Sequence, residues 1–212
     1  MKQIFVHGLG QTPASWDKTI EKLGAGETAL CPDLAKLICG GDASYNHLYT
    51  AFSAVCDACA EQLDLCGLSL GGVLALHYAI DHPEKVRSLV LIAAQYRMPK
   101  ALLRFQNIVF RLMPKAMFQQ TGFGKADFLR LCQTMMELDF SPSLAQITCP
   151  VLVVCGEKDS ANKTASRELA GRLRAAELCL LERAGHEVNT EAPEKLAELL
   201  LRFYKNIGSG RV

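Results

Sequence analysis

The chain has 212 residues, of which 50% are hydrophobic and 21% are charged, and its net charge is +1. This length and composition predict one globular domain over residues 1–212 that can bury a core. A near-neutral charge without a basic arm argues against a nucleic-acid partner. The longest apolar runs, such as 89–94, are too short for stable membrane insertion.

The cysteine pattern predicts free thiols rather than disulfides. There are nine cysteines, an odd number, and several lie inside apolar, strand-like runs. The N-terminus enters an apolar strand directly and lacks a signal-peptide pattern, so we expect a cytoplasmic protein. Cys56 and Cys59 form a C-x-x-C pair on a helical pattern, without a second pair or a nearby histidine set. Helix packing is therefore favoured over a metal or redox role, and we expect no cofactor.

Apolar, strand-like segments alternate with helical segments along the chain. The predicted strands cover 2–6, 28–31, a short stretch from Leu63, 88–94, 150–155 and 178–181. The predicted helices cover 15–23, 45–62, a stretch from Leu70 to His82, 163–174 and 192–206, with a frayed tail from 208 to 212. Continuous apolar strands that alternate with helices are typical of an α/β fold, in which helices cover both faces of a mostly parallel sheet.

One long segment breaks this alternation. Between the strands 88–94 and 150–155, residues 95–140 hold five of the six methionines in helical patterns. We predict that an inserted helical cap, over residues 95–145, covers the carboxyl edge of the sheet, where α/β proteins place their sites.

The sequence Gly67-Leu68-Ser69-Leu70-Gly71 has the G-x-S-x-G pattern of a nucleophile elbow. Such a serine occupies a strained strand-to-helix turn, and the flanking glycines avoid collisions with the neighbouring strand and helix. A neutral serine is a weak nucleophile that needs a base and an orienting acid. Asp159 and His186 each follow a later predicted strand, so a parallel sheet brings them to the same edge as Ser69. Glu157 is the nearest rival to Asp159 as the acid.

In these motifs and their order Ser69, Asp159, His186, the chain resembles the α/β-hydrolase superfamily, specifically its small esterase-like members. His7-Gly8-Leu9-Gly10 after the first strand and Pro32-Asp33-Leu34 extend the resemblance over nearly the whole chain. It implies that the backbone N–H groups of Leu9 and Leu70 form an oxyanion hole. Two N-terminal strands of the family are missing, so we expect about six strands. The family's D-x-P-G-x-G loop is also replaced, by Asp33 followed by Ala35-Lys36-Leu37.

The resemblance implies a carboxylesterase-like serine hydrolase, which cleaves a small or medium ester through an acyl-enzyme intermediate. A thioesterase or acyltransferase of the same fold, or a ligand-binding receptor without catalysis, remains an alternative. The partner is then a small-molecule ester or thioester, and the oligomeric state stays open.

Charge in the predicted cap is one-sided. Residues 95–125 include six lysines and arginines and no aspartate or glutamate. A positive potential over the pocket mouth is one interpretation, and it would attract acidic substrates. A lipid–water interface and a basic surface without a role are the alternatives.

Overall fold

The computed structural model describes residues 1–209, except for the side chains of 101–103, 105, 106 and 119–121. The predicted tail from 208 therefore lies mostly outside the described residues. Within the described range, no helix has both the length and the apolar composition needed to cross a membrane.

Six strands form one sheet in which every neighbouring pair is parallel, which confirms the predicted α/β architecture. The sheet order is β2-β1-β3-β4-β5-β6. The strands are β1 (Lys2–Val6), β2 (Ala29–Leu30), β3 (Leu63–Leu68), β4 (Val86–Ile92), β5 (Val151–Gly156) and β6 (Ala176–Leu181). The second strand is shorter than predicted. The fourth strand begins two residues earlier than predicted. It also ends two residues earlier, because Ala93 adopts a left-handed backbone conformation (φ 49°).

Helices connect the strands. They are α1 (Asp17–Leu23), α2 (Leu34–Leu37), α3 (Tyr45–Asp57), α4 (Leu70–Asp81), α5 (Lys100–Leu112), α6 (Lys125–Met135), α7 (Ser160–Arg172), α8 (Val188–Glu191) and α9 (Pro193–Gly208). Short 3-10 turns are η1 (Pro13–Trp16), η2 (Lys115–Thr121) and η3 (Leu144–Gln146). The helix predicted over 45–62 ends at Asp57, because the chain must turn to enter β3 at Leu63. Cys59 therefore lies beyond the helix that carries Cys56.

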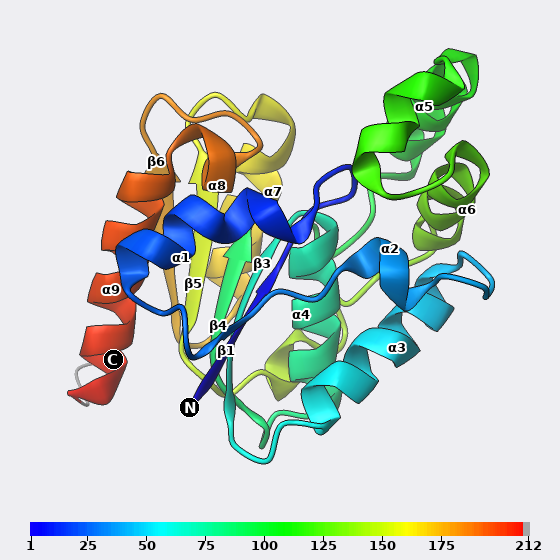
Figure 1. Cartoon of the computed structure of the whole chain (residues 1–212). Helices are drawn as coiled ribbons and strands as arrows, with labels where there is room; N and C mark the ends of the chain where they lie inside the picture. The colour runs from blue at the N-terminus through cyan, green and yellow to red at the C-terminus, as the bar shows by residue number, and fades with distance from the viewer. Residues whose placement is uncertain (210–212) are drawn as a thin grey trace.

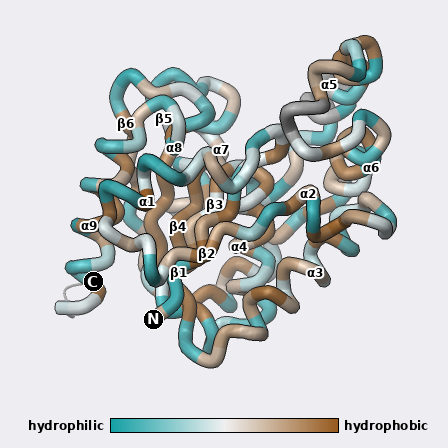
Figure 2. Tube along the Cα trace, in the orientation of Figure 1, coloured by the Kyte–Doolittle hydropathy of each residue, from teal (hydrophilic) through white to brown (hydrophobic). Residues whose placement is uncertain are grey.

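The sheet separates two apolar layers, as Figure 1 shows. On one face, Trp16 and residues of α9 such as Leu200 and Phe203 pack against Phe5 and the central strands. On the other face, α3, α4 and α7 cover the sheet, with Phe52 and Leu74 fully buried. Figure 2 shows the same division, with hydrophobic residues concentrated in the central strands. Strands that are buried on both faces read as continuous apolar runs, which is why they were recognisable in the sequence.

The strand order fixes where a site can form. From β1 the chain moves outward to β2, and it then returns to place β3 on the other side of β1. In open parallel sheets, ligands usually bind at the carboxyl ends of the strands where the order reverses, here β1 and β3. The loop after β1 and the turn after β3 lie at these ends.

The segment between β4 and β5 contains α5, η2 and α6. An isolated antiparallel bridge between Arg97 and Asp139 joins its two ends. Figure 1 shows α5 and α6 projecting at the carboxyl side of the sheet, beyond α2 and α4. The two ends of the segment, where it leaves β4 and where it returns toward β5, therefore lie side by side.

Gly156, the last residue of β5, provides a stability test. A Cβ added there would lie 1.9 Å from the carbonyl oxygen of Gly185, whereas one added at Gly171 in α7 would meet no atom within 4 Å. We expect Gly156→Ala to lower the free energy of unfolding by about 1–3 kcal/mol. Gly171→Ala, the matched control, should raise it by about 0.5–1 kcal/mol because alanine favours the helix. Urea unfolding measures both, and equal stabilities for the two variants would contradict the close contact.

Candidate active site

Ser69 occupies the turn between β3 and α4 in a strained backbone conformation, with φ 53° and ψ −115°. Two glycines permit this turn. A Cβ at Gly67 would lie 2.3 Å from the carbonyl oxygen of Gly71, and a Cβ at Gly71 would lie 2.2 Å from that of Val6. The Ser69 N–H donates to the carbonyl oxygen of Ile92 at 2.8 Å, which ties the turn to β4. These are the steric conditions of a nucleophile elbow.

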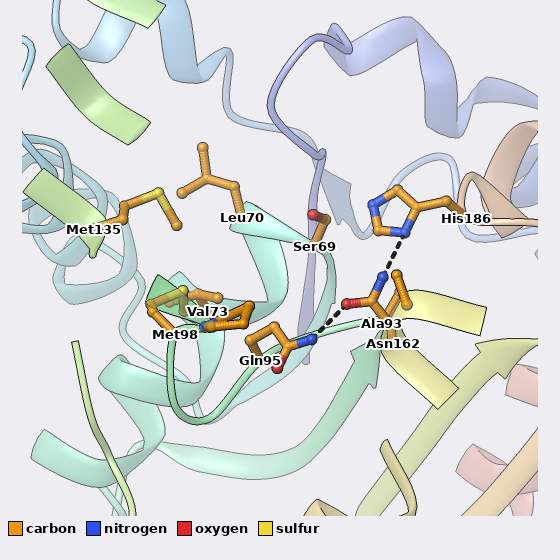
Figure 3. A pocket seen from close by; sticks show the side chains of 11 residues that line it. Ser69, Leu70, Val73, Ala93, Gln95, Met98, Met135, Asn162 and His186 are labelled. Carbon is orange, nitrogen blue, oxygen red and sulfur yellow. Dashed lines mark hydrogen bonds between the residues drawn. The ribbon is translucent and has the colours of Figure 1, made fainter. Parts of the chain in front are cut away.

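His186 and Asp159 form a hydrogen-bonded pair from two different loops. Asp159 follows β5 and precedes α7, while His186 follows β6. The distance from His186 Nδ1 to Asp159 Oδ2 is 2.7 Å, and Asp159 is almost fully buried whereas His186 is partly exposed. The far edge of the imidazole faces Ser69 in Figure 3. With Nδ1–H donated to the carboxylate, Nε2 is free to accept a proton on the Ser69 side.

Electrostatics of this pair favour a charged carboxylate beside a basic imidazole. The hydrogen bond with Asp159 raises the pKa of His186, and it outweighs the opposite effect of burial. Burial works against ionisation of Asp159, but hydrogen bonds from His186 and Asn162 dominate and lower the pKa of that carboxyl. Glu157, the rival acid, is exposed, and its carboxylate accepts the Arg183 backbone N–H at 3.1 Å.

Asn162 is a polar contact that the sequence analysis missed. Its Nδ2 donates to both carboxylate oxygens of Asp159, at 3.0 and 2.9 Å, and lies 3.2 Å from His186 Nδ1. Its Oδ1 accepts from Gln95 Nε2 at 2.7 Å, as Figure 3 shows. Asp159 is also the N-cap of α7 and accepts the backbone N–H of Asn162 at 3.3 Å. That capping relation, three residues apart, is the one signal that could have identified Asn162.

The loop after β1 lies against the serine turn. A Cβ at Gly8 would be 2.8 Å from Leu68 Cδ2 and 3.5 Å from Ser69 Cβ. Within the described backbone and side chains, the backbone N–H groups of Leu9 and Leu70 have no hydrogen-bond partner. Leu70 is also the first residue of α4. The N–H groups of the first helical turn have no acceptor within the helix, and this end of the helix dipole is positive. Both donors are therefore available to an anionic oxygen.

Two buried side chains hold this loop in place. The fully buried His7 accepts the Leu34 backbone N–H at Nε2 (3.2 Å) and donates from Nδ1 to the carbonyl oxygen of Gly8 (2.9 Å). Burial lowers the pKa of His7, which favours this neutral form. Gln11 accepts the Gly8 N–H at 3.2 Å and donates to Asn189 at 3.1 Å, which connects the loop to the helix that follows His186.

A cavity of about 140 Å³ adjoins Ser69 and His186. Its remaining lining includes Leu70 and Val73 from α4, and Met98 and Met135 from the inserted segment. Among the described residues, no lysine, arginine, aspartate or glutamate lines it. The same residues contain no group of three or more His, Cys, Asp or Glu side chains that could hold a metal ion.

Comparisons with known proteins identify the family of the chain. Residues 3–199 match the model of the alpha/beta hydrolase family. The chain is 26% identical over 249 aligned residues to the pimeloyl-[acyl-carrier protein] methyl ester esterase of Neisseria meningitidis serogroup C, covering 97% of this chain and 94% of the relative.

Solved structures show the same fold. An esterase from Thermogutta terrifontis, solved with malate bound, has a TM-score of 0.83 at 18% identity and covers 98% of this chain and 90% of its own. The enol-lactonase from Burkholderia xenovorans LB400 has a TM-score of 0.82 at 18% identity and covers 96% of this chain and 91% of its own.

The contact between Asp159 and His186 predicts how the pKa of His186 responds to substitution. Removing the carboxylate charge in Asp159→Asn removes the main cause of the raised His186 pKa and leaves the effect of burial. We therefore expect the pKa of His186 to fall in this variant, measured from the imidazole resonances by NMR. Glu157→Gln is the matched control and should leave that pKa unchanged. If the pKa of His186 fell in Glu157→Gln and not in Asp159→Asn, Glu157 and not Asp159 would be the acid.

Proposed function

Because the chain belongs to the alpha/beta hydrolase family, we propose that it is a serine hydrolase that cleaves carboxylic esters. One observation carries the proposal. Ser69, Asp159 and His186 follow three different strands, and the serine and histidine line one cavity while the aspartate bonds the histidine. A serine, a base and an orienting acid in this relation are what nucleophilic acyl transfer requires.

In the proposed mechanism, Ser69 Oγ attacks the acyl carbon while His186 Nε2 removes its proton. Asp159 keeps the imidazole in the required tautomer and stabilises the imidazolium that forms. The negative oxygen of the tetrahedral intermediate accepts hydrogen bonds from the N–H groups of Leu9 and Leu70. His186 then protonates the leaving alcohol, and an acyl-enzyme remains. Water, deprotonated by His186, attacks this ester and releases the acid and Ser69.

Asn162 acts as a positioning residue in this scheme. Both carboxylate oxygens of Asp159 accept its amide protons, so the acid cannot rotate away from His186. Gln95 fixes the Asn162 amide in turn through its oxygen. A third group that orients the acid increases the precision of the pair.

The cavity favours a small or medium acyl group. Leu70, Val73, Met98 and Met135 provide apolar contacts in a space of about 140 Å³. Methionine side chains adapt to different shapes, which suits a range of short chains. We propose that the inserted segment over 95–145 acts as the cap of this site, since Met98, Pro99 and Met135 already belong to the cavity wall.

Ser69→Ala tests the nucleophile. We expect kcat for a p-nitrophenyl ester of a short acid to fall by about 10⁴-fold or more, because only the oxyanion hole and binding remain. Ser209→Ala, an exposed serine at the end of α9, is the control and should be unaffected. A fluorophosphonate should label the wild type at Ser69 and spare the alanine variant. Retention of more than a tenth of the activity would refute the assignment, and a parallel thioester series identifies the preferred leaving group.

The pH profile tests the base. Only neutral His186 can accept the proton from Ser69, so kcat/KM should fall tenfold per pH unit below the His186 pKa and level off above it. Since the pKa is raised above 6.5, we expect the midpoint of the acidic limb to lie above that value. A midpoint below 6.5 would be incompatible with His186 as the base in this electrostatic setting.

A further inference from the structure

An apolar surface lies on α5 and η2, away from the cavity. Ile108 is 59% exposed, Val109 39%, Leu112 82% and Met117 57%. We call these four residues the apolar tip. They account for four of the seven large hydrophobic residues that are exposed in the described part of the chain. Positions 108, 109 and 112 share one side of a helix, and an exposed apolar group of this kind marks an interaction site.

Three unpaired cations surround the apolar tip. In the inserted segment, Lys100 pairs with Glu137, and Lys125 donates to the carbonyl oxygens of Arg111 and Met113. Arg104, Arg111 and Lys115 are exposed and make no ion pair with any described residue. The hydrogen bond from Lys100 lowers the pKa of Glu137 and the charge of Arg104 adds to this effect, so Arg111 and Lys115 are the least compensated. Arg97 has no ion pair within the described part of the chain either, but it lies at the base of the segment beside Asp139. The positive charge that the sequence shows is therefore presented beside exposed aliphatic groups.

A groove next to the apolar tip has the donors that a phosphate needs. Its volume is about 320 Å³, and its lining includes Arg104, Asn107 and Arg111 from α5 and Gln133 from α6. Asn107 is 6% exposed, and only its amide nitrogen can donate to a phosphate oxygen. Guanidinium groups bind phosphate oxygens in a paired geometry, and amides can add further donors. Ile108 and Met136 complete the groove with apolar walls.

We propose that α5 and η2 dock the protein onto the surface of an anionic phospholipid bilayer. The apolar tip enters the boundary between headgroups and acyl chains, and Arg104, Arg111 and Lys115 contact lipid phosphates. Interfacial helices have this combination of an apolar side and a basic side. Binding of this kind needs no chemistry at Ser69, so it stands apart from the proposed hydrolysis.

The shape of the molecule favours a bilayer over a folded protein partner. Figure 1 places α5 at an outer corner of the molecule, opposite α9. A protruding corner of aliphatic side chains can enter a soft surface without a preformed pocket. Hot spots of protein interfaces are enriched in tryptophan, tyrosine and arginine. Residues 100–121 supply arginines to this surface but contain no tryptophan or tyrosine.

Vesicle sedimentation tests the proposal on the full chain. We expect Ser69→Ala protein to bind phosphatidylglycerol vesicles at low salt and to bind phosphatidylcholine vesicles at least tenfold more weakly. Leu112→Ser should reduce the partition coefficient about tenfold, from the lost burial of one leucine. Arg111→Gln should reduce it about fivefold. Exposed sites tolerate both changes. As a check of the fold, each substitution is also made in protein that keeps Ser69, where thermal unfolding and turnover of a soluble ester should be unaltered.

Matched controls lie on the opposite side of the molecule. Leu201 is 47% exposed on α9 and is followed by the exposed Arg202, so Leu201→Ser and Arg202→Gln repeat both substitutions outside the proposed surface. Their binding should equal that of the unaltered protein. Failure of the protein to bind anionic vesicles, or equal losses in the controls, would overturn the proposal.

Three further results would also overturn it by assigning the surface to another occupant. Soluble glycerol 3-phosphate that binds as tightly as vesicles would indicate a free phosphate ligand. Polyglutamate binding that Leu112→Ser weakens equally would indicate an acidic polypeptide. A dimer in sedimentation velocity that Leu112→Ser dissociates would indicate a second copy of the chain.

Discussion

The close approach of α4 to the end of β1 is the constraint on which the site depends. The backbone at Gly71 packs so tightly that any side chain there would reach within 2.2 Å of the Val6 carbonyl oxygen. This contact brings the N-terminus of α4 beside the loop that carries Leu9, so the N–H groups of Leu9 and Leu70, which have no partner among the described residues, belong to neighbouring segments. It also forces the left-handed backbone at Ser69, a conformation that costs about 1–3 kcal/mol and that the surrounding structure must hold. The buried sheet and α4 supply that support, and the strain keeps the hydroxyl outside the core.

Hydrogen bonds between distant loops turn this contact into a fixed arrangement. Glu191 accepts the N–H groups on either side of His186, from Gly185 at 2.6 Å and from Glu187 at 3.1 Å. Asn189, two residues earlier, accepts a hydrogen bond from Gln11 across 178 residues of sequence. The loop with the imidazole and the loop with Leu9 are therefore held by the same short helix, α8. A shift of either loop would strain the other, which couples the position of the proposed base to that of the proposed oxyanion donor Leu9.

The sequence predicted the parts of this site that depend on local pattern and strand order. The G-x-S-x-G turn identifies itself through its glycines, and the parallel sheet brings the ends of β3, β5 and β6 to one edge. Asn162 escaped prediction because its role arises from a side-chain hydrogen bond that only the folded loop creates. The end of α3 was misplaced for a related reason: helical periodicity continues past Asp57, but pairing of β3 with β1 and β4 requires the chain to leave the helix earlier. The sequence placed Met98 and Met135 in a predicted cap, but which methionines line the cavity depends on how α5 and α6 fold and could not be predicted.

The basic residues of the inserted segment are numerous, but they do not line the cavity. The six basic residues between 95 and 125 are compatible with attraction of an acidic substrate into the pocket, but the described cavity lining carries none of them. Bonds within the segment engage Lys100 and Lys125. Arg97 lies beside Asp139 at the base of the segment, and Arg104, Arg111 and Lys115 border the apolar tip. A field from the surface falls off within about 10 Å at 0.1 M salt, whereas the apolar lining acts on the acyl group directly. Under the two proposals, the features have different roles: the cavity selects acyl groups by shape, and the outer surface selects esters that lie at an anionic membrane.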